Sequence, residues 1–299
     1  MEKLMNMVPV VWASQHDGRP EYACTAQLNY VFDQYPCVHF PIDEVKKAKE
    51  MCESAIFVVH GDKQTPEVAV LNAEMDIFES VLVIVIGDEE NLFPVERIDH
   101  THMKLWIQEP MPGRHDAFVD RRLIMGFTPY TAKPYRSAMP RDYDFFFAGQ
   151  VTHSRRYAAI RGMEATDAQG VIIQTRGYQK GISLGEYLSL MGRSKFVPCP
   201  SGPFSCDSAR PWEALQCGAV PILDDLSPSR KQPGFWNYVL GEHPLPVITD
   251  WDYFPEMLEV LKRDYPAKQD QAMRWWQAYQ EDYVVWLGDD WRDLREGIR

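Results

Sequence analysis

Short, continuous apolar runs alternate with segments of helical periodicity through the first half of the sequence. The runs are strand-sized and rich in β-branched residues, whereas apolar positions in residues 23–35 and 68–78 recur every three or four residues. Strands are therefore expected at residues 8–14, 55–59, 81–86 and 104–107. Continuous apolar strands separated by helices are typical of a parallel sheet covered by helices on both faces.

The same alternation starts again after an interruption at residues 128–142. Prolines and scattered tyrosines, lysines and arginines break all periodicity there, as at a boundary between domains. Beyond it, strands are expected at residues 144–148, 171–174, 196–199 and 245–249. We predict an α/β protein made of two Rossmann-like domains, with C-terminal helices packing across their junction. The predicted parts are residues 1–137, 138–252 and 253–299.

The stretch from residue 184 to residue 225 reads as helix, strand, polar loop, helix and strand. Ser208 and Arg210 lie where the loop meets its second helix, Pro211 suits the first turn of that helix, and Glu213 follows. Hydroxyl donors, a guanidinium and a carboxylate at a helix N-terminus beyond a parallel strand can hold the phosphates and ribose of a nucleotide. The stretch therefore predicts a nucleotide site.

A second anion-binding turn is expected after the strand at residues 144–148. Gly149 ends this strand, and Thr152, Arg155 and Arg156 precede or open the next helix. Arg176 follows the strand at residues 171–174 and is a candidate for contact with the base. Both strand ends should lie at the same edge of the second sheet.

Composition narrows the class of partner. The formal net charge is -12 and the sequence pI is near 5.1, which argues against a general nucleic-acid or anionic-membrane surface. The N-terminus shows no cleavage pattern of a signal peptide, and no apolar run approaches the roughly 20 residues of a membrane span. We expect a soluble cytoplasmic protein that has no membrane partner.

No metal site is predicted. The six cysteines lie far apart without a CxxC pair, so neither a zinc ribbon nor a disulfide framework is indicated. Asp99, His100 and His102 lack a further ligand at suitable spacing. Asp224 and Asp225 superficially resemble a metal-binding acidic motif, but a sugar contact or a turn cap accounts for them equally well.

A dense, ordered motif resembles the exostosin-type glycosyltransferases. The resemblance rests on FFFAGQVTHSRR and on YLSLMGRSKFVPCPSGPFSCDSARPWEALQCGAVPILDD, within residues 143–226, which is under a third of the chain. It implies a GT-B fold, with two Rossmann-like domains facing across a cleft. It further implies a nucleotide-sugar donor in the C-terminal domain and an acceptor in the N-terminal one. We predict that this donor is a UDP-sugar. The anchor of the family's eukaryotic members is not seen.

The predicted function is that of a hexosyl- or pentosyltransferase. It moves a sugar from the nucleotide donor to an acceptor hydroxyl, with inversion as the resemblance implies, and it needs neither a metal nor another cofactor. The predicted donor-binding residues are Gly149, Thr152, Arg155, Arg156, Arg176, Ser208, Arg210 and Glu213.

An inverting reaction needs a general base, which should come from the carboxyl ends of the first sheet. Asp17, with His16 beside it, follows the first strand and is the preferred candidate. Other candidates follow later strands, and no spacing argument separates them. They are His60, Asp62, Asp88 and Glu109.

The acceptor stays open between two classes. A saccharide is the default by family analogy, and a hydroxymethylated DNA base, as modified by phage glycosyltransferases, is the alternative. If DNA is the acceptor, the chain is expected to be a phage protein that acts in the host cytoplasm. Binding of DNA also needs a basic patch on the protein. One cluster qualifies: Arg121, Arg122, Lys133, Arg136 and Arg141. A third hypothesis is a non-catalytic module that binds a nucleotide sugar or glycan.

Overall fold

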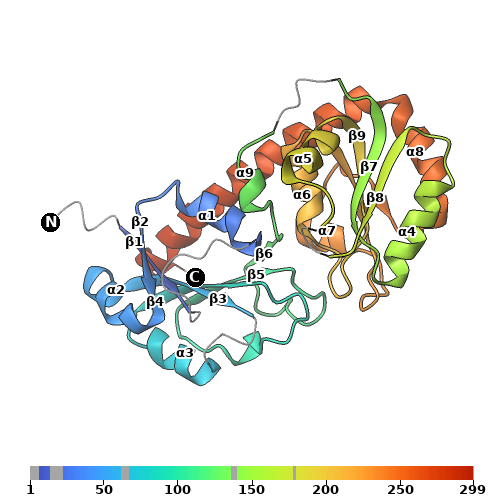
Figure 1. Ribbon diagram of the computed structural model, residues 1–299. Helices are drawn as coiled ribbons and strands as arrows, with labels where there is room; N and C mark the ends of the chain where they lie inside the picture. Colours follow the sequence, from blue (N-terminus) through green and yellow to red (C-terminus); the bar gives the residue numbers. More distant parts are fainter. Residues whose placement is uncertain (1–6, 14–22, 62–66, 136–139, 178–179, 299) are drawn as a thin grey trace. The chain divides into compact units, whose positions relative to one another are not determined.

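The computed structural model describes residues 7–13, 23–61, 67–135, 140–177 and 180–298. The chain divides into two compact units (Figure 1). Unit 1 comprises residues 1–125 and 280–299, and unit 2 comprises residues 126–279. The boundary in the sequence therefore lies at residues 125 and 126, whereas the sequence suggests residues 137 and 138. Of the predicted C-terminal part, residues 253–279 belong to unit 2 and residues 280–299 belong to unit 1.

Unit 1 contains a six-stranded sheet with the order β2-β1-β3-β4-β5-β6, in which every pair of neighbours is parallel. The central strands consist of the buried apolar runs that the sequence shows. The strands are β1 (Val8–Trp12), β2 (Cys37–Pro41), β3 (Ser54–His60), β4 (Ser80–Ile86), β5 (Met103–Gln108) and β6 (Arg121–Leu123).

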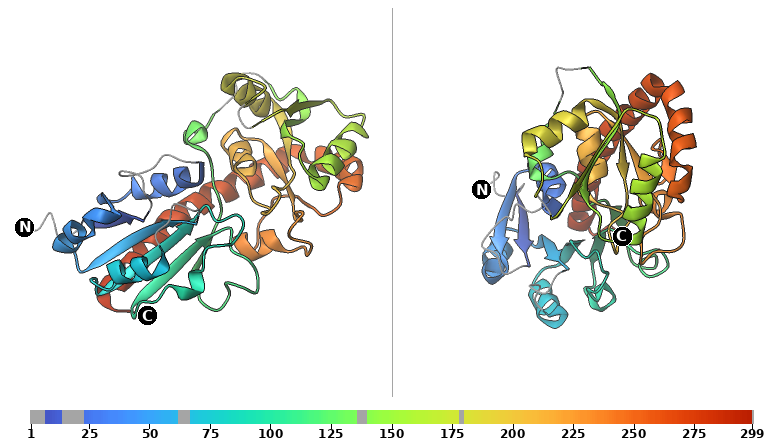
Figure 2. Two further views of the ribbon diagram at one scale, coloured as in Figure 1. Left: turned by 60° about the horizontal axis from the view of Figure 1, so that its bottom comes forward. Right: turned by 45° about the vertical axis from the view of Figure 1, so that its right-hand side comes forward.

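Helices cover both faces of this sheet. Helices α2 (Val45–Met51) and α3 (Val68–Met75) pack on one face. Helix α1 (Ala26–Phe32) and the last turns of α9 (Tyr265–Glu296) pack on the other. Figure 2 shows this part of α9 lying along the sheet. The apolar character of both faces explains why the strand runs are continuous rather than alternating.

The end of α9 is an integral part of unit 1. Tyr283, Leu287, Trp291 and Leu294 are buried in the core with strands of the sheet. Asp290 is also buried, where it accepts hydrogen bonds from Trp106 Nε1 at 2.8 Å and from Lys104 Nζ at 2.9 Å. Aromatic residues that recur at helical spacing near the end of α9 are thus part of the core.

Unit 2 contains a five-stranded parallel sheet with the order β11-β10-β9-β7-β8. Its strands are β7 (Tyr143–Gln150), β8 (Gly170–Thr175), β9 (Ser194–Cys199), β10 (Val220–Asp224) and β11 (Val247–Ile248). The helices are α4 (Ser154–Glu164), α5 (Leu184–Gly192), α6 (Ala209–Gln216), α7 (Phe235–Leu240) and α8 (Phe254–Arg263). Helices α5 and α6 lie on one side of the sheet and α4 and α8 on the other (Figure 1). The predicted α/β architecture with two parallel sheets is confirmed.

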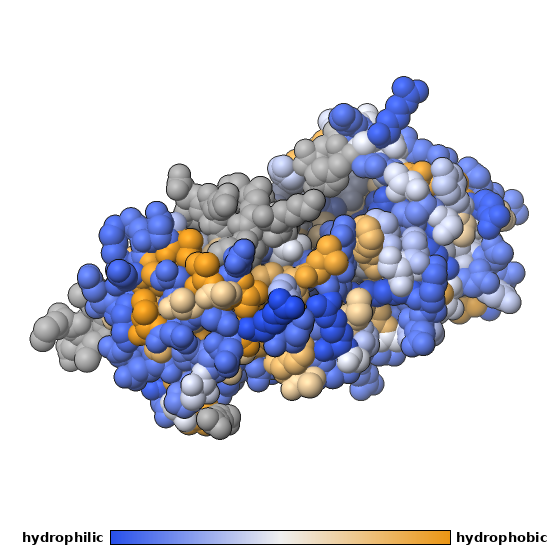
Figure 3. Space-filling view, turned by 90° about the horizontal axis from the view of Figure 1, so that it is seen from below, coloured by the Kyte–Doolittle hydropathy of each residue, from blue (hydrophilic) through white to orange (hydrophobic). Residues whose placement is uncertain are grey.

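Hydrophilic residues cover most of the face seen in Figure 3, and apolar residues gather mainly over unit 1. Within the described ranges, no helix combines the length and apolar character that crossing a membrane requires. The long helix α9 instead carries charged residues such as Arg274 and Asp270, which pair on its exposed side.

Candidate functional site

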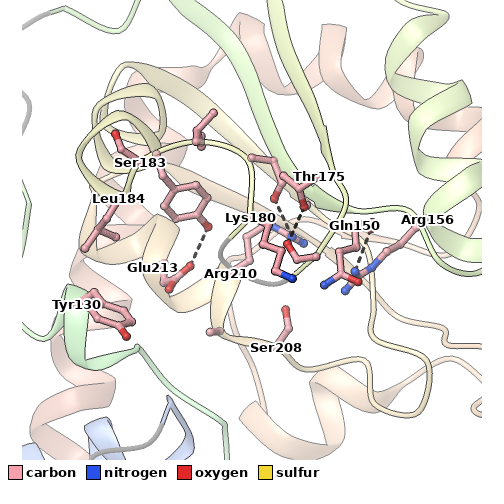
Figure 4. Close-up of a pocket in the computed structure, with 16 residues that line it drawn as sticks. Tyr130, Gln150, Arg156, Thr175, Lys180, Ser183, Leu184, Ser208, Arg210 and Glu213 are labelled. Atoms are coloured by element: carbon pink, nitrogen blue, oxygen red, sulfur yellow. Dashed lines mark hydrogen bonds between the residues drawn. The ribbon is translucent and has the colours of Figure 1, made fainter.

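Unit 2 holds a cavity of about 500 Å³ at the carboxyl edge of its sheet. The ends of β7 and β8 supply Gly149, Gln150 and Thr175, and the first residues of α5 and α6 complete the wall (Figure 4). This edge is where ligands bind in open parallel α/β sheets. Helices α5 and α6 both begin here, and the first backbone N–H groups of an α-helix have no partner within the helix.

The loop before α6 is fixed so that Ser208 faces the cavity. Asp207, which is buried, accepts hydrogen bonds through Oδ1 from the backbone N–H of Ser208 at 2.7 Å and from Trp212 Nε1 at 2.8 Å. Ser208 occupies the N-cap position of α6 but makes no side-chain cap hydrogen bond. Its buried Oγ has no hydrogen-bond partner among the described residues, so this hydroxyl is available to a ligand.

Arg210 is the cationic centre of the cavity. Its Nη2 donates to the carbonyl of Ala148 at 3.1 Å, and its guanidinium lies 4.8 Å from the ring centroid of Phe147. Its Nε and Nη1 are buried and have no hydrogen-bond partner in the described part of the chain. Burying a charge without a partner is unfavourable, so the site is built for a negatively charged ligand.

Gly149 provides the space that Arg210 occupies. A Cβ atom on Gly149 would lie 2.6 Å from Nη2 of Arg210. We expect Gly149→Ala to displace the guanidinium and weaken binding of an anionic ligand about tenfold, because one charged hydrogen bond is worth about 1.5–3 kcal/mol. Binding of UDP, measured by calorimetry, checks this. Gly185→Ala is the control: its Cβ meets nothing within 4 Å, so UDP binding should stay unchanged. Equal affinities of both variants would contradict the prediction.

Glu213 lies one turn after Arg210, on the same face of α6. Its Oε1 accepts a hydrogen bond from Thr128 Oγ1 and its Oε2 accepts one from Tyr187 Oη, both at 2.8 Å. Burial, followed by the charge of Glu213, raises the pKa of Tyr187 well above its usual value, so the phenol stays protonated and donates. The carboxylate is thereby fixed in orientation and can accept from two neighbouring hydroxyls, as a ribose presents them.

Two further cations line the cavity, Arg156 and Lys180. Arg156 donates through Nε to the carbonyl of Ser201 at 3.1 Å and through Nη1 to that of Gln150 at 3.0 Å. With Arg210 they supply three positive charges against the one carboxylate of Glu213. The cavity is therefore suited to a ligand that carries more than one negative charge.

Five of the predicted donor-binding residues meet at this cavity: Gly149, Arg156, Ser208, Arg210 and Glu213. Arg155 is engaged elsewhere, since its Nε donates to Oδ2 of the fully buried Asp224 at 3.2 Å and its Nη2 to the carbonyl of Thr249 at 3.0 Å. Thr152 and Arg176 are exposed and are not among the described residues that line the cavity.

Three residues of the site are not predicted from the sequence: Thr128, Tyr130 and Tyr187. Tyr187 has helical spacing with apolar neighbours and reads as core, and Thr128 lies in the aperiodic segment taken as a linker. Gln150 was also missed, although a polar residue after a strand that ends in glycine is a usable signal. The other three become visible only through contacts between distant segments.

Asp224 and Asp225 have structural partners. Asp225 accepts hydrogen bonds from the backbone N–H groups of Gly234 at 2.6 Å and Trp236 at 3.3 Å, and Asp224 pairs with Arg155. His100 contacts the carbonyls of Phe78 and His102 rather than another ligand. The part of the chain that the structure describes contains no group of three potential metal ligands.

The predicted general base falls where nothing is described: Asp17, His16 and the alternative Asp62 all lie outside the described residues. Of the alternatives within them, Asp88 accepts hydrogen bonds from the backbone N–H groups of Leu92 and Phe93 and is 5% exposed. Burial raises its pKa to about 6.

The remaining two alternatives occupy strand ends of unit 1. Glu109 is fully buried with a φ of 54°, and His60 lies with its Nε2 3.4 Å from Cys24 Sγ. A Cβ on Gly87 would lie 2.5 Å from the His60 ring, so this glycine admits the ring. The described candidates at these strand ends, Asp88, Glu109 and His60, are thus buried or in contact with other protein groups.

Within the described residues, part of the basic cluster considered for DNA is already paired inside the protein. Arg121 pairs with Asp290 through Nε at 3.3 Å. Arg141 donates to the carbonyls of Ser194 and Cys217, and burial lowers its pKa. The physical reason is that an acidic side chain and backbone carbonyls of the same unit already satisfy these guanidinium groups. Lys133 is exposed, Arg122 lies 4.0 Å from Asp116, and Arg136 lies outside the described residues.

No family model matches this chain, and no curated protein matches its sequence. Its structure is similar to that of the DNA-modifying enzyme β-glucosyltransferase, determined in the presence and absence of uridine diphosphoglucose. The TM-score is 0.52 at 11% identity, over 97% of this chain and 99% of the other.

T4 phage BGT in complex with UDP and Mn²⁺ has a TM-score of 0.47 at 9% identity, over 95% of this chain and 99% of its own. Anabaena HepE in complex with UDP-glucose has a TM-score of 0.47 at 10% identity, over 97% and 100%. Together with the two parallel sheets, the similarity to the β-glucosyltransferase shows that this chain has the GT-B fold, as the sequence predicts.

Proposed function

We propose that this protein is a glycosyltransferase that moves a sugar from a UDP-sugar to an acceptor hydroxyl. The observation that carries the proposal is Arg210, with two buried N–H groups that no described residue accepts, one turn before Glu213 and next to Ser208. A nucleoside diphosphate presents phosphates and ribose hydroxyls in this order. The GT-B fold of the chain supports the same function by analogy.

The chemistry follows from the leaving group. When the bond between the anomeric carbon and the diphosphate breaks, negative charge grows on the phosphate oxygens. A helix N-terminus stabilises an exposed anion by only about 0.3–1 kcal/mol, whereas each hydrogen bond to a charged group is worth about 1.5–3 kcal/mol. Arg210 should therefore contribute more than the N-terminus of α6, with Ser208 as a neutral donor.

We extend the proposal to a reaction that needs no metal. Arg156, Lys180 and Arg210 can supply the positive charge that a divalent cation would otherwise provide at the diphosphate. The sugar then moves with inversion, and a base of unit 1 takes the proton of the acceptor hydroxyl. Asp17 with His16 remains our preferred base, because the carboxylate of Asp88 already accepts two backbone hydrogen bonds.

A saccharide is the acceptor that we propose first. We also propose that the protein acts in the cytoplasm. The DNA-modifying activity named for the similar β-glucosyltransferase keeps a hydroxymethylated DNA base as the second candidate. The engaged state of Arg121 and Arg141 argues against it. Kinship with the exostosin-type family is proposed on the motif in residues 143–226.

Release of UDP from a panel of UDP-sugars tests the function. We expect release to accelerate on addition of either oligosaccharides or hydroxymethylated DNA, and to persist in EDTA. If donors bind but UDP is not released at all, not even by slow hydrolysis, the protein is a non-catalytic module. Absence of binding to every nucleotide sugar would refute the proposal as a whole.

A further inference from the structure

The donor cavity has an apolar end that the phosphate and ribose contacts leave unused. Tyr130 and Leu184 line it, and their side chains are 54% and 46% exposed. In Figure 4 these two residues lie on one side of Glu213, while Gln150 and Arg156 lie on the other. The cavity is thus divided into an apolar end and a cationic end, with the carboxylate between them.

This division follows the order of groups in a nucleotide. Arg210 and Glu213 are three residues apart on α6, so their Cα atoms are separated by about one helical turn, roughly 4.5 Å along the helix axis. If phosphates occupy the cationic end and the ribose lies at Glu213, the next group is the flat base. Tyr130 and Leu184 are the residues that this group reaches.

Tyr130 is held by a rigid support although its ring is exposed. It lies in a single 3-10 turn, Pro129–Thr131, where the Thr131 N–H donates to the carbonyl of Thr128 at 3.0 Å. Both threonines are 1% exposed, and Thr128 is tied to Glu213 by its hydroxyl. An aromatic ring on a fixed backbone binds a flat partner with little loss of conformational freedom.

The other end of this segment is also fixed. The backbone N–H of Tyr135 donates to the carbonyl of Gln216, the last residue of α6, at 3.0 Å. The segment therefore contacts α6 near both ends, and Tyr130 is presented between these two contacts. A segment fixed to a helix at two points is expected of a binding surface rather than of a flexible linker between domains.

We infer that Tyr130 is the platform on which the base of the donor nucleotide stacks, with Leu184 as a second apolar contact. This inference rests on the proposed function, because it needs a nucleotide in the cavity. It assigns recognition of the nucleoside to the segment that opens unit 2, a segment that sequence reasoning treats as a boundary. Stacking tolerates any base, so the platform supplies affinity while edge contacts choose among bases.

The test compares two ligands, UDP and inorganic pyrophosphate, by calorimetry on the whole protein. Tyr130→Ala is expected to raise the Kd for UDP about tenfold, within the range typical of stacking, and to leave that for pyrophosphate unchanged. Tyr130→Phe keeps the ring and should bind UDP as the wild type does. Tyr157→Ala removes a tyrosine that is 58% exposed on α4 and is the control, with no expected change.

Each other result has a defined meaning. Unchanged UDP binding by Tyr130→Ala overturns the inference while leaving the proposed function intact. An equal loss for UDP and pyrophosphate overturns it too, because the effect then lies at the phosphates or in the fold. A loss in Tyr130→Phe as large as in Tyr130→Ala assigns the contact to the hydroxyl and not to the ring. If the wild type binds no UDP, the proposed function itself fails.

Discussion

Replacing Arg210 with alanine is expected to weaken binding of a UDP-sugar at least tenfold and to reduce turnover further. The ground state loses a charged hydrogen bond worth about 1.5–3 kcal/mol, and the transition state loses stabilisation of the growing charge on the diphosphate. The free energy of unfolding of Arg210→Ala should not fall together with its affinity for the UDP-sugar. Within the described residues, Arg210 makes one hydrogen bond, to Ala148, and two of its buried nitrogens have no partner, so its removal also relieves desolvation.

This opposite behaviour of binding and stability separates a ligand-binding arginine from a structural one. Calorimetry with UDP and UDP-glucose measures the first, and chemical denaturation measures the second. Arg161→Ala is the matched control on α4, because Arg161 is 72% exposed and pairs with Asp252 only at 3.9 Å. A large loss of stability in Arg210→Ala, with affinity retained, would remove Arg210 from the donor site.

Replacing Asp224 with asparagine is expected to reduce the free energy of unfolding by about 3 kcal/mol. Asp224 is fully buried, and its Oδ2 accepts from Arg155 Nε at 3.2 Å, from the Ser201 N–H at 3.3 Å and from Trp251 Nε1 at 2.9 Å. The neutral amide leaves Arg155 without its counter-charge and replaces one acceptor by a donor. We choose the lower end of the usual range, because the Arg155 side chain is 17% exposed and water compensates part of the loss.

Urea denaturation, analysed for the transition of unit 2, measures this change. Asp252→Asn serves as the control, since this carboxylate is 72% exposed and pairs weakly with Arg161, and less than about 0.5 kcal/mol is expected there. An Asp224→Asn protein as stable as the wild type, but unable to bind UDP, would return Asp224 to the functional site.

The fold was predictable because each central strand of the first sheet is an uninterrupted run of apolar residues in the sequence. β4 reads SVLVIVI and is buried throughout, so local sequence is sufficient to identify it. β2 and β6 were not predicted. β2, Cys37–Pro41, is half-buried and includes His39, and β6, Arg121–Leu123, begins with two arginines. Both are strands at the edges of the sheet, where one side is not paired and apolar continuity is not required.

The site was predictable only in part, for a different reason. Arg155 and Arg156 are neighbours in the sequence, but on a helix they point about 100° apart, so one pairs with Asp224 and the other lines the cavity. The choice depends on a carboxylate 69 residues away. Glu213 was identified from its place at the start of a helix, whereas Thr128 and Tyr187, which orient it, are 85 and 26 residues away.

Helix α9 sets the order in which the chain can complete its structure during synthesis. Unit 2 is formed by one uninterrupted segment that ends at residue 279, whereas unit 1 takes residues from both ends of the chain. The strands of unit 1 are synthesised before unit 2. The face of their sheet that Tyr283, Leu287 and Trp291 cover nevertheless stays exposed until residues 280–299 leave the ribosome. The sheet of unit 1 is therefore completed after unit 2, and its uncovered apolar face is prone to aggregation until then.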